Sequence, residues 1–215
     1  MACAFRGKTV LITSGPTREA LDPIRFITNA SSGRMGFALA RAARRLGARV
    51  LVVSGPTSLR SPLGVTVYRV STALQMYRRV MALRARADVV IGAAAVSDWR
   101  FSRVSPRKLK RGLSALRLTL IPNPDIIKEV ARRRPRGRRQ VVVGFALETH
   151  ERLAHARRKL LDKGLDAIVA NGPAALSCRR SQAVLLRRDG AKRPLREAAK
   201  ESLARAILRE VAPLL

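Results

Sequence analysis

Residues 9–36 of the chain contain a set of side chains suited to binding phosphate and carboxylate groups. The apolar run Thr9–Thr13 indicates a strand that ends at Ser14-Gly15-Pro16, and a helical pattern begins only near Met35. Strand-to-helix turns in α/β units usually take about 2–6 residues, so we expect a polar loop of this length to be functional. Its polar members offer hydroxyl, guanidinium and amide groups: Thr17, Arg18, Arg25, Asn29, Ser31 and Ser32.

Two parts of this loop point to specific chemistry. Ser31-Ser32-Gly33 leads into a helix expected to begin near Arg34, so hydroxyls and free backbone N–H groups would meet at a positive helix end, which favours an anion. Ordinary capping by either serine is the alternative, and both roles are compatible. Asn29 is an uncharged donor and acceptor that could hold a carbonyl or acyl-phosphate oxygen. Considered alone, an asparagine in a loop is more often a turn residue.

Further candidates lie where later strands end. Gly92-Ala93-Ala94 closes a buried apolar run, and small residues there let a ligand lie on the backbone, where doubly wound sheets bind ligands. Close helix packing is the alternative. Asp98 could accept hydrogen bonds from a nucleotide or help to hold Mg²⁺. Pro124-Asp125-Ile126-Ile127 opens a helix whose first N–H groups are free to meet a ligand.

Three lysines and one aromatic residue have ordinary interpretations when considered alone. Lys108 lies in the Pro-containing segment Ser102–Gly112, where a solvated charge run is the simpler explanation. Lys159 and Lys163 are four residues apart on one helix face and would be surface lysines. Phe145 ends an apolar strand and would pack in the core, or against a base.

The order of elements predicts the fold class. Apolar strands alternate with amphipathic helices, which indicates a parallel sheet covered on both faces. Asp189-Gly190 separates two short apolar runs and predicts a hairpin. Leu116, Leu118 and Leu120 alternate with polar residues, as in a half-exposed strand. We therefore expect one α/β domain over residues 1–215, with a doubly wound, mostly parallel, Rossmann-like sheet and a small antiparallel hairpin appendage.

Some functional classes lack their motifs. A nicotinamide-dependent reductase of the short-chain type would need GxGxxG after the first strand, but the turn here is Gly15-Pro16-Thr17. It would also need a Tyr-x-x-x-Lys pair, whereas Thr72 follows Tyr68 and Met81 follows Tyr77 at that spacing. A Walker A motif is also absent from the sequence.

The formal charge of +30 raises the alternative of a non-catalytic, basic nucleic-acid-binding domain. Of the 44 basic residues, 36 are arginine, and they are scattered over all predicted helices in an Ala- and Leu-rich chain, as biased codon usage would produce. Aromatic residues make up only 4%, which is few for base stacking. We expect non-specific attraction of RNA at low salt and no specific nucleic-acid partner.

Several motifs in order resemble one enzyme family. SGPTRE, LDPIRFITNASSGRMG, AAAVSDWR, NPDII and GFALET are similar to phosphopantothenate–cysteine ligase, and the resemblance runs from about Lys8 to about Arg209. It implies an enzyme of coenzyme A synthesis. Many bacterial relatives fuse this domain to a flavin-dependent decarboxylase, and because 215 residues leave no room for that partner we expect a stand-alone ligase. The carboxylate of 4′-phosphopantothenate would attack the α-phosphate of a nucleoside triphosphate, and the amine of L-cysteine would then attack the acyl-nucleotide.

The resemblance also implies roles for residues. Asn29 would contact the acyl-nucleotide, Arg25 a substrate carboxylate or phosphate, and Lys108 the triphosphate from a mobile flap. The nucleotide would meet the remaining matched positions: Gly15, Ser31, Ser32, Gly33, Gly92, Ala93, Ala94, Asp98, Pro124, Asp125, Ile126, Ile127, Phe145, Lys159 and Lys163. The family usually has Ala-Asn-Asp where this chain has Ala170-Asn171-Gly172, so the contribution of that aspartate is missing.

The expected co-substrate is CTP, with ATP as the alternative, because the motifs look bacterial. Mg²⁺ would bridge phosphate oxygens, with protein ligands that the sequence does not identify. We expect no flavin, a homodimer, and a separate flavin-dependent decarboxylase acting next. No apolar run approaches the roughly 20 residues of a membrane span, and the N-terminus has no signal-peptide pattern, so a cytoplasmic protein with Cys3 and Cys178 as free thiols is expected.

Overall fold

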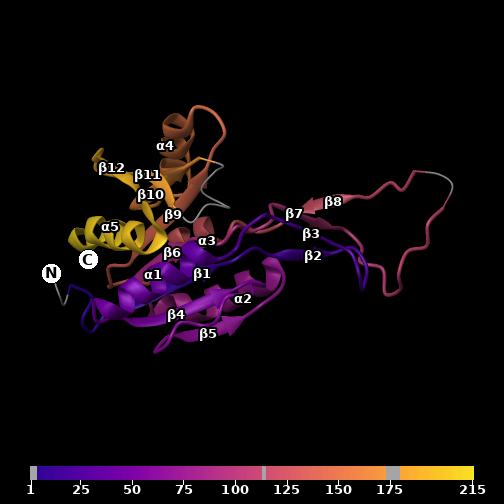
Figure 1. Cartoon of the computed structure of the whole chain (residues 1–215), viewed down its shortest axis with the longest axis horizontal. Coiled ribbons are helices and arrows are strands. Elements are labelled where there is room, and N and C mark those ends of the chain that lie inside the picture. Colours follow the sequence, from indigo (N-terminus) through magenta and orange to yellow (C-terminus); the bar gives the residue numbers. More distant parts are fainter. Residues whose placement is uncertain (1–3, 113–114, 173–179) are drawn as a thin grey trace.

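The computed structural model describes residues 4–112, 115–172 and 180–215 (Figure 1). Their central feature is an eight-stranded sheet with the order β12-β11-β10-β9-β6-β1-β4-β5. The strands are β1 Thr9–Ser14, β4 Arg49–Ser54, β5 Thr66–Arg69, β6 Val89–Gly92, β9 Val141–Leu147, β10 Ala167–Asn171, β11 Arg180–Arg187 and β12 Lys192–Ala199. The predicted mostly parallel, doubly wound sheet is confirmed.

The connectivity of the parallel strands locates a ligand-binding position. From β1 the chain builds outward to β4 and β5 on one side, and then to β6, β9 and β10 on the other. The order therefore reverses between β1 and β6. In open α/β sheets, ligands bind outside the carboxyl ends of the strands at this reversal, which here means the ends at Ser14 and Gly92.

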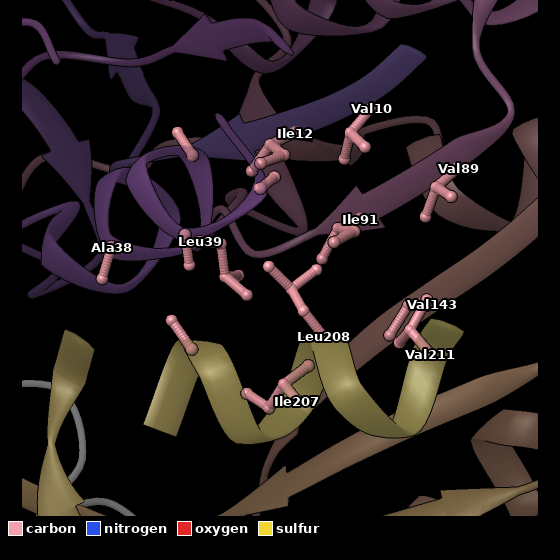
Figure 2. Packing of buried hydrophobic residues seen from close by; sticks show 14 of the residues in the cluster. Val10, Ile12, Ala38, Leu39, Val89, Ile91, Val143, Ile207, Leu208 and Val211 are labelled. Atoms are coloured by element: carbon pink, nitrogen blue, oxygen red, sulfur yellow. The ribbon is translucent and has the colours of Figure 1, made fainter. Parts of the chain in front are cut away.

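Helices cover both faces of the sheet because alternate strand residues are apolar on each face. Helix α1 (Arg34–Arg45) and helix α5 (Lys200–Val211) pack together over one face. Figure 2 shows Leu208 of α5 next to side chains of α1 and β6. The other face is covered by α2 (Ala73–Leu83), α3 (Ile126–Arg132) and α4 (Arg152–Asp162).

A long arm leaves the sheet at the carboxyl ends of β1 and β6 (Figure 1). It contains two small antiparallel sheets, β2 (Arg18–Ala20) with β3 (Phe26–Thr28), and β7 (Trp99–Phe101) with β8 (Leu120–Pro122). Strands β2 and β7 are in contact. The sequence predicted only a loop between β1 and α1, because three-residue strands are too short to show a period. The half-exposed strand predicted around Leu116 and Leu118 begins only at Leu120.

The predicted hairpin at Asp189-Gly190 is present as β11 and β12. It is part of the main sheet, because β11 pairs with β10 in antiparallel register. Two short 3₁₀ helices, η1 (Arg84–Arg86) and η3 (Ala212–Leu214), follow α2 and α5. Within the described residues, no helix is both long and apolar enough to cross a bilayer. Cys3 and Cys178 lie outside the described residues.

Candidate active site

The turn after β1 is joined directly to the turn after β6. Gly15 has φ +75°, and its carbonyl accepts a hydrogen bond from the Ala95 N–H at 2.9 Å. Pro16 and Ala95 form a parallel β-bridge, and Thr17 Oγ1 accepts from the Ser97 N–H at 3.0 Å. These bonds explain why the loop is ordered despite its polarity, since its backbone groups pair with a strand end far along the chain.

Asn29 is held against the same strand end. Its Nδ2 donates to the carbonyl of Ala95 at 3.2 Å and to that of Val96 at 3.0 Å. An amide NH₂ has two hydrogens, so both are directed at carbonyl oxygens. The residue is exposed. Its oxygen is therefore the group that a ligand would meet first.

Helix α1 begins directly on the end of β1. A Cβ at Gly36 would lie 2.4 Å from Ser14 Oγ, and one at Gly33, which has φ +77°, would lie 3.3 Å from the Gly15 Cα. Only glycines allow this approach. Gly33 caps the helix without a side-chain hydrogen bond, and the first turn contains no acidic residue. The first N–H groups of the helix are therefore available to an anion.

A small cavity of about 130 Å³ lies at this helix end. Ser31, Ser32 and Gly33 line it from the loop, Ala93 and Ala94 from the end of β6, and Phe145 from β9. The structure thus brings together six of the residues predicted to bind the nucleotide. Ser32 is also tied to the next loop, because its carbonyl accepts from Thr57 Oγ1 at 2.8 Å.

A larger cavity of about 600 Å³ adjoins it and collects most of the other predicted positions. Its lining includes Asn29, Gly92, Ala94, Asp98, Pro124, Asp125, Ile126, Ile127, Phe145, Lys159 and Lys163. Phe145 and Ala94 line both cavities. The two cavities therefore meet beside the strand ends where the sheet order reverses. Gly15 contributes the turn that supports them.

The two lysines of this cavity are paired with carboxylates. Lys159 Nζ lies 2.7 Å from Glu148 Oε1, and Lys163 Nζ lies 2.8 Å from Asp125 Oδ2. Burial raises the pKa of Glu148, but hydrogen bonds from Lys159 and His155 outweigh it and the net pKa is lowered. Glu148 thus stays ionised beside Lys159. A bound polyphosphate would have to share or replace these partners.

Arg25 and Lys108 lie elsewhere, at the far part of the arm, and neither lines the two cavities. Arg25 Nε donates to Asp22 Oδ2 at 2.9 Å, and its Nη2 donates to the Leu109 carbonyl at 2.7 Å. The hydrogen bond from the Arg25 side chain is the main cause that holds the pKa of Asp22 well below its usual range. The segment that carries Lys108 is thereby docked on the β2–β3 hairpin.

The described residues include no cluster of three or more His, Cys, Asp or Glu side chains that could hold a metal ion. Asp98 is exposed and lines the larger cavity, while Asp125 caps α3 and pairs with Lys163. This set fits Mg²⁺ in its usual role at nucleotides, where one or two carboxylates and the substrate phosphates bind it. It does not fit an all-protein metal site.

Three residues of the site were not predicted. Asn171 and Lys200 line the small cavity, and Glu148 neutralises Lys159. Asn171 is the last residue of the last parallel strand, a position that could have marked it. Lys200 begins a helix more than 160 residues after the Asn29 loop and carries no local signal. Beside Asn171, a Cβ at Gly172 would lie 3.1 Å from Arg152 Nη1, so Arg152 borders the position where the family has aspartate.

Comparisons with known proteins agree with this geometry. The DNA/pantothenate metabolism flavoprotein C-terminal domain matches residues 5–214. The coenzyme A biosynthesis bifunctional protein CoaBC of Vibrio parahaemolyticus is 47% identical over 169 residues, which are 78% of this chain and 42% of that protein. The chain thus spans less than half of that relative's length. The relative is named as bifunctional, so it offers no support for the predicted separate decarboxylase.

Solved structures show the same relationship. The crystal structure of the C-terminal domain of a CoaBC protein has a TM-score of 0.84 and 37% identity, covering 98% of this chain and 97% of that one. A Cab2 variant in complex with phosphopantothenate-cysteine has a TM-score of 0.77 at 20% identity, over 97% of this chain and 86% of that one, and shares the fold. The family resemblance of the sequence motifs is thereby confirmed. The chain belongs to the family of the DNA/pantothenate metabolism flavoprotein C-terminal domain.

Proposed function

We propose that this chain is a phosphopantothenate–cysteine ligase. In the first step the carboxylate oxygen of 4′-phosphopantothenate attacks the α-phosphorus of a nucleoside triphosphate, and pyrophosphate leaves. In the second step the amine of L-cysteine attacks the acyl carbon, the nucleoside monophosphate leaves, and the amine gives up a proton. The reaction involves no change of oxidation state, so flavin has no part in it.

One observation supports the proposal most directly: Asn29 is anchored in the lining of a cavity at the carboxyl ends of β1 and β6, where the strand order reverses. The site holds cations, backbone N–H groups and an amide, and no activated nucleophile is needed. Transfer of a nucleotidyl group depends mainly on positioning and charge stabilisation. The family assignment favours this function over a short-chain reductase or a nucleic-acid-binding domain.

The geometry of Asn29 suggests how it acts. Its two amide hydrogens bind Ala95 and Val96, which fixes the orientation of the amide. The amide oxygen can then accept an N–H of the incoming cysteine amine and direct its lone pair at the acyl carbon. A donor role toward the acyl oxygen would require the release of one of these two anchors.

We infer that the nucleotide occupies the two adjoining cavities, with phosphates toward the α1 N-terminus. CTP is proposed ahead of ATP, with Mg²⁺ bridging its phosphates and Asp98 as a carboxylate near them. Lys108 would stabilise the phosphate charge, which requires its segment to leave the position beside Asp22 and Arg25. Arg25 would bind the substrate carboxylate or phosphate under the same condition.

A homodimer is part of the proposal, and the arm supports it. Ile24 and Trp99 are 60% and 51% exposed, and Phe26, Val104, Leu116 and Leu120 are also exposed on the arm. Large apolar side chains that are exposed together on one arm are typical of an interface. A second copy of the chain would cover it. Light scattering at assay concentration should give twice the 23.6 kDa of one chain.

The function is tested by measuring pyrophosphate release with purified protein. Release should require both the nucleotide and phosphopantothenate, and the acyl-nucleotide should accumulate until cysteine is added. Comparing kcat/KM for CTP and ATP decides the nucleotide, and omission of Mg²⁺ tests the metal. Pyrophosphate release that does not depend on phosphopantothenate would overturn the assignment.

A further inference from the structure

Lys200 is a buried cation that the proposed mechanism has not used. It is only 6% exposed, and its Nζ donates to Ser181 Oγ at 2.9 Å. It is the first residue of α5, and it lines the small cavity at the N-terminus of α1. Lys200 therefore brings a basic side chain to the same cavity as the first residues of α1.

The surroundings of Lys200 concentrate positive potential. The N-termini of α1 and α5 meet at the cavity, and neither has a side-chain cap. A helix N-terminus disfavours a cation, and here a cation stands beside two of them. The only acidic residue in the first turn of α5 is Glu201, whose carboxylate is engaged by Arg41 at 2.7 Å. The described lining of the cavity contains no carboxylate.

Asn171 is an independent indication that a ligand binds here. It is 8% exposed at the end of β10, and it lines the same cavity. Its Oδ1 has no hydrogen-bond partner among the described residues. A buried polar atom without a partner is costly. A ligand in the cavity would satisfy this amide, through its oxygen or, after rotation about the last side-chain bond, through its NH₂ group.

We propose that Lys200 binds a phosphoryl group of a substrate, seated on the N-terminus of α1 in the cavity that it shares with Asn171. The cavity of about 130 Å³ suits a group of a few heavy atoms, since a water takes about 30 Å³ in the liquid. The inference rests on the proposed function for the identity of the substrates. Both the nucleotide and 4′-phosphopantothenate carry such a group, and the experiment separates them.

A purely structural role for Lys200 makes a different prediction. If its bond to Ser181 mainly stabilised the fold, removing either partner would lower the melting temperature and leave ligand affinity unchanged. Lys200→Met keeps the aliphatic part of the side chain and removes the charge. Removing one partner of a buried polar contact costs stability, so a lower melting temperature is expected under either account. Under our proposal, Lys200→Met also loses affinity for a ligand, whereas Ser181→Ala keeps it.

The test is calorimetric titration of the unaltered protein, Lys200→Met and Ser181→Ala, each with CTP–Mg²⁺ and separately with 4′-phosphopantothenate. Lys200→Met should weaken one of the two ligands by about tenfold or more, because a charge-assisted hydrogen bond is lost. The ligand that weakens identifies the source of the phosphoryl group. Ser181→Ala, which keeps the ammonium, should bind both ligands within about threefold of the unaltered protein.

Each other outcome contradicts the proposal in a recognisable way. If Lys200→Met binds both ligands as tightly as the unaltered protein does, the proposed role of Lys200 is refuted. Turnover by the unaltered protein would in that case still support the ligase function. Failure of the unaltered protein to bind either ligand overturns both proposals. If Lys200→Met does not fold, hydrogen exchange of the unaltered protein decides: the ligand should protect the amides of residues 34–36, and lack of protection overturns the site.

Discussion

The side chain of Asn29 donates a hydrogen bond to the carbonyl of Ala95 at 3.2 Å, across 66 positions of sequence. This bond joins the loop after β1 to the strand end of β6, where the order of the sheet reverses. It also fixes the orientation of the amide of a residue that lines the larger cavity. The residue that the sequence singled out for chemistry is thus held by a contact that links the two halves of the sheet.

Asn29→Ala is expected to fold normally and to lose ligase turnover by about 10²–10³, as for removal of a positioned polar group in other enzymes. The side chain is exposed, so its loss should change stability little. Single-turnover assays of pyrophosphate release and of amide formation would locate the affected step. Gln182→Ala removes another exposed amide, on β11 outside the two cavities described, and should behave as the unaltered protein. Full turnover by Asn29→Ala would contradict the assignment.

Lys108→Gln is expected to slow pyrophosphate release while the melting temperature stays nearly unchanged. The segment around Lys108 is anchored through the backbone of Ser105 and Leu109 and through Arg25, so its docking does not depend on the lysine side chain. Lys110→Gln removes a neighbouring charge as the control and should have a smaller effect. A large fall in melting temperature for Lys108→Gln would show that the side chain packs as part of the fold.

Gly36→Ala is expected to destabilise the protein by about 1–3 kcal/mol, the usual cost of overpacking. The new Cβ would lie 2.4 Å from Ser14 Oγ and 2.5 Å from Ser14 Cβ, so α1 would have to move away from the end of β1. Because this shift would also move the N-terminus of α1, where we propose that the phosphates bind, nucleotide affinity should fall. Gly172→Ala meets only the flexible end of Arg152 and serves as the control. Equal denaturation midpoints for the two variants would refute the close contact.

Asp22 should hold the segment around Leu109 on the β2–β3 hairpin at any pH above about 4. Its pKa is lowered in the folded protein, so its ionised form adds stability that is complete above the unfolded value of about 3.9 and is lost as pH falls. Asp22→Asn should therefore speed hydrogen exchange at the Leu109 amide, relative to the unaltered protein at the same pH, by one constant factor from pH 5 to 8. The difference from the unaltered protein should shrink only below that range. A difference that changes between pH 5 and 8 would assign the docking to another group.

Salt should separate the ligase from non-specific binding of RNA. Between about 50 and 200 mM salt, RNA affinity that rests on counterion release should fall steeply. Ligase activity should fall much less, because its contacts are short and partly buried. Both titrations are made on one preparation. Tight, sequence-selective RNA binding at the upper concentration would restore the nucleic-acid alternative that the charge of +30 raises.

The sequence by itself determined the family and the alternation of strands and helices, and its motifs pointed to nearly half of the residues that line the two cavities. Local periodicity reports the strands and helices because each apolar strand and each amphipathic helix must bury its own face, whereas the family and the site residues followed from the resemblance of the motifs. The glycines of the Ser31–Gly36 region and the small residues after β6 also carry a local signal, since only such residues let a helix or a ligand approach the backbone. The Asn29 loop is therefore recognisable from its residue types and their spacing alone.

Only the tertiary structure decided how the charges of the site are paired and where the arm residues lie. Glu148 neutralises Lys159, Asp125 pairs with Lys163, and Asp22 engages Arg25 outside the two cavities. The two strand pairs of the arm are too short to show a period, so they form only where the ends of β1 and β6 bring them together. Lys200 comes to the N-terminus of α1 because α5 packs beside α1 on the sheet, a contact set by long-range burial that no local pattern encodes.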